Sequence, residues 1–237
     1  MILMGIINLT PDSFYAPSRV DGETALRERI DDLLSRGCGI LDLGAVSTRP
    51  GASYVPVEEE WRRLKPALHT AAAAAKVSVD TTSSVIVRRV YEEIGPFIVN
   101  DISAGEDDPA MLPLVAELGL PYIAMHKRGN PRSMDALTDY PQGVTAAVKE
   151  YFRQFAGKAE RLGISEWILD PGFGFAKTSE QNWQLLRDLP IFREFGRPIL
   201  VGVADKRFTK DPLFGGGDPS LAERLAVEGG ADILRIH

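Results

Sequence analysis

The sequence is poor in the features that would point away from an ordinary globular enzyme. It has one cysteine, Cys38, which excludes an internal disulfide network and a cysteine-rich zinc site. Basic residues are not in excess: 27 Lys and Arg against 33 Asp and Glu give a net charge of −6, which argues against a broad surface for nucleic acid or for anionic membranes. We therefore expect no nucleic-acid or membrane partner, and we expect Cys38 to be a small buried hydrophobe.

Long hydrophobic runs are also missing. No apolar stretch approaches the ~20 residues that a bilayer-spanning helix needs, and the first residues lack the basic segment and cleavage site of a secretory leader. These features, together with the single cysteine, predict a cytoplasmic protein.

Length and composition fit a globular fold with a sizeable core. The chain has 237 residues, of which 44% are hydrophobic and 25% charged, as in typical globular proteins. No Gly/Ser-rich linker or compositional break divides it. We therefore expect a single domain over residues 1–237.

Short runs rich in Val, Ile and Leu recur along the chain, each followed by polar residues and then by a stretch of helical periodicity. This alternation is typical of βα units. The eight candidate strands are 2–8, 39–44, 77–80, 97–102, 122–126, 167–170, 198–203 and 232–237. The seven candidate helices between them lie near 23–37, 57–75, 83–94, 109–119, 142–163, 179–188 and 219–229.

Eight apolar strands that are buried on both faces predict an α/β fold, a TIM (β/α)8 barrel. The eighth candidate strand runs to His237, so the last outer helix of such a barrel is missing from the sequence. We expect either a neighbouring chain or further sequence to cover that part of the barrel.

Polar and ionisable residues stand where the candidate strands end: Asn8, Asp42, Asp80, Asn100, Asp101, His126, Asp170, Lys206, Arg235 and His237. Each alone has a simpler explanation, because Asn and Asp form turns and a lone Asp after a strand often caps the next helix. Capping does not call for Lys, Arg or His, however, and the C-terminal ends of barrel strands converge on one face. We interpret the set as a functional site at the barrel mouth.

The set divides into two chemical halves. One half consists of acceptors and amides that suit the donor-rich edge of a flat heterocycle, together with one amine that can donate to the carbonyl or ring nitrogen of that ring. Its members are Asp80, Asn100, Asp170 and Lys206. Neutral or cationic donors suited to phosphate oxygens are Asn8, Arg49, Arg235 and His237. The sequence thus predicts a site for a ring that carries an anion such as pyrophosphate.

At these positions the sequence resembles the dihydropteroate synthase family, in eight ordered segments across the chain. They are MGIINLTPDSF at 4–14, LDLGAVSTRPGA at 41–52, VSVDT at 77–81, IVNDISAGE at 98–106, MHKRGNP at 125–131, DPGFGFAKT at 170–178, LVGVADK at 200–206 and LRIH at 234–237. The resemblance implies that 4-aminobenzoate displaces pyrophosphate from a (7,8-dihydropterin-6-yl)methyl diphosphate in folate biosynthesis. It also implies Mg²⁺ as the cofactor and two small-molecule substrates. Whether the protein forms a homodimer stays open.

The resemblance assigns roles to individual residues. The pterin would be bound by Asp80, Asn100, Asp170 and Lys206, and the diphosphate by Asn8, Arg49, Arg235 and His237, with Asn8 near the metal. The aminobenzoate would be bound by Thr48, Pro50 and Phe175. Loops 12–19 and 47–52 would close over the site and exclude water. Catalysis, attributed to Lys206, Asp80 and Arg235, would rest on positioning and electrostatics without an enzyme nucleophile.

The sequence departs from the family pattern after the seventh candidate strand. Relatives usually carry Ser-Arg-Lys-Ser there, whereas this chain has Ala204, Asp205, Lys206 and Arg207. A lost hydroxyl and an added carboxylate should weaken binding of the aminobenzoate carboxylate. A pterin-binding paralogue without synthase activity is therefore an alternative. A methyltetrahydrofolate methyltransferase is a more distant one, because it does not share the NLTPDSF and STRPG loops.

Overall fold

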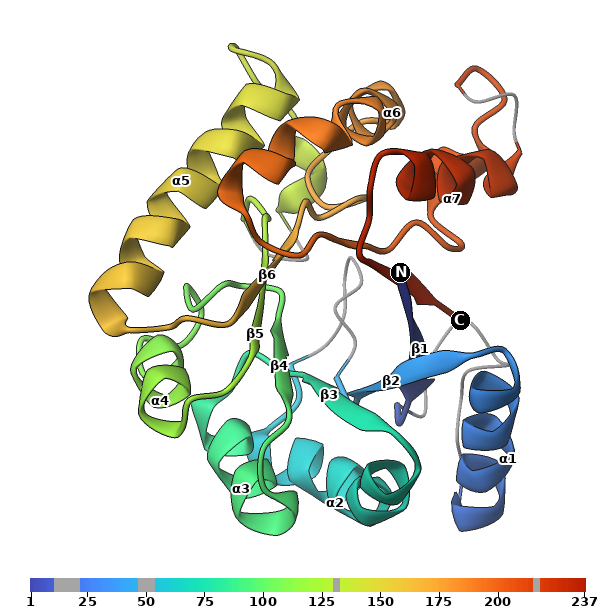
Figure 1. Cartoon of the computed structure of the whole chain (residues 1–237), viewed down its shortest axis with the longest axis vertical. Helices are drawn as coiled ribbons and strands as arrows, with labels where there is room; N and C mark the ends of the chain where they lie inside the picture. The colour runs from blue at the N-terminus through green and yellow to red at the C-terminus, as the bar shows by residue number, and fades with distance from the viewer. Residues whose placement is uncertain (11–21, 47–53, 130–132, 215–217) are drawn as a thin grey trace.

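The strands form one closed, parallel sheet. The computed structural model describes residues 1–10, 22–46, 54–129, 133–214 and 218–237. Eight strands follow the order β6-β5-β4-β3-β2-β1-β8-β7 and curl into a barrel with helices around it (Figure 1). The two end strands meet at a bridge between Leu169 and Ile199, where the Leu169 amide also donates to the Pro198 carbonyl. The predicted barrel is confirmed.

The strands lie within two residues of their predicted positions. They are β1 (Ile2–Asn8), β2 (Cys38–Gly44), β3 (Lys76–Asp80), β4 (Ile98–Asp101), β5 (Tyr122–Met125), β6 (Trp167–Asp170), β7 (Leu200–Val201) and β8 (Ile233–Ile236). β7 is the shortest, because it pairs with β8 only at Leu200 and Val201. The next residue, Gly202, lies against the Arg235 side chain, where a Cβ would stand 2.9 Å from Nη2.

The helices pack on the outside of the barrel (Figure 1). They are α1 (Gly22–Ser35), α2 (Val57–Ala74), α3 (Ser84–Ile94), α4 (Met111–Leu118), α5 (Val144–Leu162), α6 (Ser179–Arg187) and α7 (Pro219–Glu228). Local sequence sets some of their starts: Ser83 caps α3, and Thr178 with Gln181 forms a capping box on α6. The structure adds the short 3-10 helices η2 (Met134–Ala136), η3 (Leu189–Phe195) and η4 (Arg207–Lys210), which are too short for periodicity to reveal.

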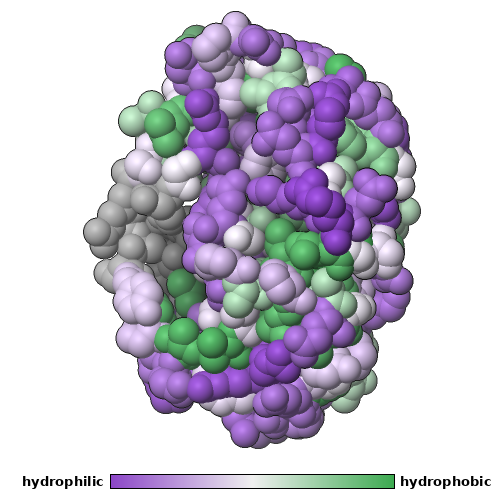
Figure 2. All heavy atoms as spheres, turned by 90° about the vertical axis from the view of Figure 1, so that its left-hand side faces the viewer, coloured by the Kyte–Doolittle hydropathy of each residue, from purple (hydrophilic) through white to green (hydrophobic). Residues whose placement is uncertain are grey.

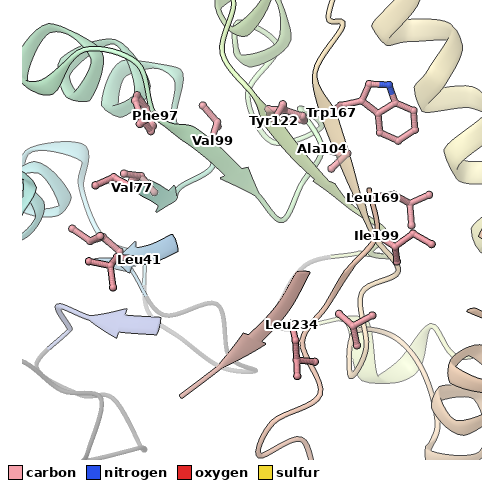
Figure 3. Packing of buried hydrophobic residues seen from close by; sticks show 14 of the residues in the cluster. Leu41, Val77, Phe97, Val99, Ala104, Tyr122, Trp167, Leu169, Ile199 and Leu234 are labelled. Carbon is pink, nitrogen blue, oxygen red and sulfur yellow. The ribbon is translucent and has the colours of Figure 1, made fainter. Parts of the chain in front are cut away.

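The main hydrophobic core lies between the strands and the helices. Figure 3 shows part of it, with Leu41, Val77, Val99, Leu169 and Leu234 on β2, β3, β4, β6 and β8. Where β5 and β6 meet α5 the core is aromatic: Tyr122 stacks on Phe155 at 5.9 Å, and Phe155 meets Trp167 edge-on at 5.1 Å. Cys38 is buried in this core, as predicted. On the side of α4 and α5 the outer surface is mostly hydrophilic, with smaller hydrophobic patches (Figure 2).

A second, smaller cluster fills the floor of the barrel. It consists of Met4, Ile40, Ile123, Leu200 and Ile233, with Ile98 and Ile168 packed against it. Because successive side chains on a strand point to opposite faces, residues two and four positions further on share this inner face. They are Ile6 and Asn8, Asp42 and Gly44, Asn100, Met125, Asp170, Gly202, and Arg235 with His237. The same alternation therefore builds an apolar floor and a polar upper layer.

No helix in the described part of the chain has the length and apolar character that a bilayer crossing requires.

The aromatic core under α5 makes a stability prediction. Phe152 is fully buried and packs against Trp167, Phe192 and Phe195 with ring centroids 6.2–6.4 Å apart. Phe152→Ala should lower the free energy of unfolding by about 3–5 kcal/mol because it opens a cavity, as measured by urea denaturation. Val227→Ala, at a helix position that is 45% exposed, should change it by less than about 0.5 kcal/mol. Equal losses in the two variants would contradict this description of the core.

Candidate active site

A large cavity opens where the strands end. Its volume is about 1300 Å³. Its lining includes the strand-end residues Asn8, Asp42, Gly44, Asp80, Gly202, Arg235 and His237, and the loop residues Phe175, Lys177, Lys206, Arg207 and Lys210. Strand ends distant in sequence thus meet around one space, as the barrel prediction required.

Most of the predicted site residues gather here. Those that line the cavity are Asn8, Asp80, Phe175, Lys206, Arg235 and His237. Asn100 and Asp170 are 0% and 1% exposed and bind residues of the lining, Asp42 and Arg235 respectively. The predicted residues Thr48, Arg49 and Pro50, and the lid loops 12–19 and 47–52, lie outside the described residues.

Arg235 is the cation at the centre of the site. Its Nη2 lies 3.3 Å from Oδ2 of Asp170, and the guanidinium packs so closely on Gly202 that a larger residue there would collide with it. Burial acts to lower the pKa of Arg235, but the charges of Asp170, Asp42 and Asp80 outweigh it and the pKa is raised. Arg235 therefore stays charged in a buried position.

The carboxyl groups around Arg235 exceed what one cation can neutralise. Burial raises the pKa of Asp80 to about 8; the charge of Asp42 adds to the rise, and Arg235 opposes it. Burial also raises the pKa of Asp42. Like charges that share a buried site cannot all ionise, so the cluster holds a proton at neutral pH.

Asp42 fixes the orientation of Asn100. The Asn100 amide nitrogen donates to both Asp42 oxygens, at 3.0 and 3.3 Å. The amide oxygen of Asn100 is buried, and within the described residues it has no hydrogen-bond partner. A buried acceptor in this state favours a ligand that brings an N–H group. Asp42 was absent from the predicted pterin-binding set, although its position two residues after Ile40 on β2 could have identified it.

Two residues expected at the mouth face elsewhere. Asp101 follows Asn100 directly, so its side chain points to the opposite face; it accepts from the Ser103 and Gly105 amides and from the Tyr122 hydroxyl at 2.6 Å. His126 is 3% exposed, and its Nδ1 lies 3.0 Å from Nζ of Lys177. Neither is among the described residues of the cavity lining. The expectation that they stand at the mouth was wrong: both anchor loops.

The donor half of the site is less charged than its composition suggests. Burial lowers the pKa of His237 to about 4, so its imidazole is neutral at pH 7 and can offer an N–H rather than a charge. Asn8 offers a neutral carboxamide. Of the three predicted donors Asn8, Arg235 and His237, Arg235 is the one that carries a positive charge.

In the altered loop after β7, the negative charge of Asp205 is balanced by a nearby cation. Asp205 adopts a left-handed backbone with φ of 55°, and its Oδ1 lies 3.1 Å from Nζ of Lys210. Lys206, Arg207 and Lys210 all line the cavity. The added carboxylate is thus paired with a cation, and this edge of the cavity still offers positive charge to an anionic substrate.

Comparison with known proteins agrees with this geometry. Residues 4–237 match the family model of pterin-binding enzymes. A dihydropteroate synthase of Synechocystis sp. is 37% identical over 248 residues, which cover 99% of this chain and 84% of the relative. The chain belongs to the dihydropteroate synthase family. The predicted family and enzyme class are confirmed, and nothing in these relatives supports an inactive paralogue.

Solved structures of dihydropteroate synthases superpose on the whole chain. The enzyme of Xanthomonas albilineans with 4-aminobenzoic acid has a TM-score of 0.84 at 36% identity, covering 100% of this chain and 87% of that one. The Clostridium difficile enzyme, in the presence of pteroic acid, has a TM-score of 0.84 at 30% identity, covering 100% and 90%. The barrel is therefore the fold of the family.

The carboxyl cluster predicts a pH-dependent effect on stability. The pKa of Asp80 is about 8, against an ordinary value of 3.8, so the folded state binds this proton more tightly than the unfolded state. Its contribution to stability is complete below pH 3.8 and is lost as the pH rises through 8. Asp80→Asn should therefore stabilise the protein more at pH 8.5 than at pH 5. If the substitution restores about 2 kcal/mol of the free energy of unfolding at pH 8.5, Tm should rise there by about 4–8 °C.

Thermal unfolding at the two pH values checks this. Asp31→Asn, at an exposed helix position, is the matched control and should shift Tm little at either pH. If Asp80→Asn destabilised the protein equally at both pH values, the buried-proton description would be wrong.

Proposed function

We propose that the chain acts as a dihydropteroate synthase through one shared cavity, in which buried carboxyl and amide groups hold the pterin and cationic donors hold the diphosphate. The 4-aminobenzoate nitrogen would form a bond to the pterin methylene, while the methylene–oxygen bond breaks and its electron pair leaves with diphosphate. The anilinium proton is then lost to give 7,8-dihydropteroate. The observation that carries this proposal is the position of Arg235, which contacts Asp170 and lines the same cavity as Asn8.

The acceptor groups suit the pterin ring. A pterin presents an amino group and a ring N–H along one edge, and the acceptors that would receive them are Asp42, Asp80, Asn100 and Asp170. Asp42, Asn100 and Asp170 are buried and Asp80 is partly buried, which strengthens hydrogen bonds to a ligand that excludes water. Lys206 would donate to the ring carbonyl from the cavity edge.

The donor groups suit the leaving diphosphate. Negative charge builds on the departing oxygen, and fixed donors aimed at it lower the barrier without needing to reorganise. Arg235, His237 and Asn8 are the described residues that we assign to this role. Arg49 is assigned with them from the family resemblance.

We assign Mg²⁺ to the same end of the cavity. Mg²⁺ prefers oxygen ligands and commonly completes its shell with substrate phosphates and water rather than with a protein cage. The Asn8 carboxamide oxygen, from a residue that lines the same cavity as Arg235 and His237, would fit this requirement. The bound ion would supply neutralisation of charge on the diphosphate.

The aminobenzoate would lie between the pterin and the cavity edge. Phe175 offers an aromatic face, with Nζ of Lys206 5.0 Å from its ring centroid. Arg207 offers a cation for the carboxylate, because Lys210 already pairs with Asp205. Thr48 and Pro50 are assigned to this pocket by resemblance. The cytoplasmic location and a homodimer are likewise proposals that rest on the family alone.

A diphosphate-release assay tests the proposal. With pterin diphosphate, 4-aminobenzoate and Mg²⁺, the protein should release one diphosphate for each 7,8-dihydropteroate formed, and release should need both substrates. Lys206→Ala should lower kcat by about 10²-fold or more, since a donor to the reacting ring is lost. Lys158→Ala, on the exposed face of α5, should leave kcat unchanged. Binding of pterin diphosphate without any release would favour the paralogue instead.

A further inference from the structure

The loop after β6 folds around a buried ammonium group that the proposed mechanism does not use. Lys177 is 8% exposed. Its Nζ lies 2.8 Å from the Gly172 carbonyl, 3.0 Å from the Phe175 carbonyl and 3.0 Å from Nδ1 of His126. An ammonium has three N–H donors, so these acceptors match its full capacity.

The backbone is bent so that these carbonyls turn inward. Gly172, Gly174 and Ala176 have φ values of 72°, 81° and 50°, so every second residue is left-handed. At Gly172 a Cβ would lie 1.9 Å from the His126 carbonyl oxygen, which only glycine tolerates. The left-handed backbone of Ala176 is strained, because the residue has a Cβ. The contacts to Nζ offset that strain.

Among the residues that the structure describes, other contacts hold the loop on either side of Phe175, and none of them reaches its carbonyl. The Gly174 amide donates to the Asn182 side chain at 2.8 Å, and the Tyr140 hydroxyl donates to the Ala176 carbonyl at 3.0 Å. Lys177 is thus the side chain that holds the Phe175 backbone from beneath. From the cavity side the Phe175 ring faces Nζ of Lys206 at 5.0 Å.

The three acceptors that contact Nζ of Lys177 carry no charge. Burial lowers its pKa to about 7, while Asp170 opposes that shift. The neighbouring His126 is neutral, because burial and the charge of Lys177 lower its pKa well below the ordinary value. Placing a cation among neutral acceptors is unfavourable for stability, which indicates a role in geometry rather than in stabilisation.

We propose that Lys177 is a positioning residue for the aminobenzoate ring, which it places by fixing the Phe175 carbonyl and so the direction of the Phe175 side chain. This inference rests on the proposed function, since it needs Phe175 to contact that substrate. Lys177 reaches the cavity lining, but the proposed arrangement gives it no contact with either substrate; its role is to set the pocket of one of them.

Steady-state kinetics with both substrates provide the test. Lys177→Met keeps a chain of similar length without the donors and should raise KM for 4-aminobenzoate about tenfold, while KM for the pterin diphosphate changes less than about threefold. A general loss of structure would lower the active fraction and kcat without this split. Lys127→Met is the matched control: Lys127 is also buried, at 6% exposed, but pairs with Asp107 at 2.7 Å away from the cavity lining.

A double-mutant cycle locates the effect at Phe175. If Lys177 acts through Phe175, the rise in KM caused by Lys177→Met should disappear in the Phe175→Ala background. Should Lys177→Met fail to fold, Lys177→Gln, which keeps a shorter neutral donor, should show the same split between the two KM values.

The outcomes separate the two proposals. Additive effects of the two substitutions, or equal KM values for the Lys177 and Lys127 variants, would overturn the role of Lys177 alone. Failure of the parent protein to release diphosphate would overturn the proposed function, and the role of Lys177 with it.

Discussion

The site depends on one buried guanidinium shared by three carboxyl groups. Arg235 contacts Asp170 directly and interacts electrostatically with Asp42 and Asp80. With one cation among three acids, the cluster must either hold a proton or receive hydrogen-bond donors from a ligand. A pterin supplies such donors on its edge, and the other face of the same cation remains for an anion. In the proposed function, Arg235 would thus link the two halves of the substrate site.

Strand alternation explains why these groups meet. On β1, β2 and β8 the inward residues run from an apolar floor, Met4, Ile40 and Ile233, to polar residues two or four positions later. The floor is packed, so water has no route through the barrel from below. Burial on this side is what raises the pKa values of the carboxyl groups above it, and the fold itself therefore prepares the chemistry of the mouth.

The sequence was sufficient for the strands, the helices and the gathering of most of the described candidate residues at one end of the barrel, because apolar runs and strand-end positions are local signals. It was insufficient where the face of a strand decides which way a side chain points. Asp42 was left out of the ligand set, and Asp101 and His126 were included at the mouth, because only the inner or outer face of a strand separates them. The pairing of Asp205 with Lys210 and the loop around Lys177 depend on left-handed backbone at alanine and aspartate, which residue type alone does not predict.

The most direct test of the shared-cation description is the proton balance of pterin binding. Calorimetric titration with a 6-hydroxymethyl pterin at pH 7, in buffers of different ionisation enthalpy, measures protons exchanged per site. Ring N–H donors favour ionised carboxylates, so the parent protein should release a proton, up to about one per site, and Asp80→Asn should release none. Binding without proton release in the parent, or equal release by Asp80→Asn, would contradict the account.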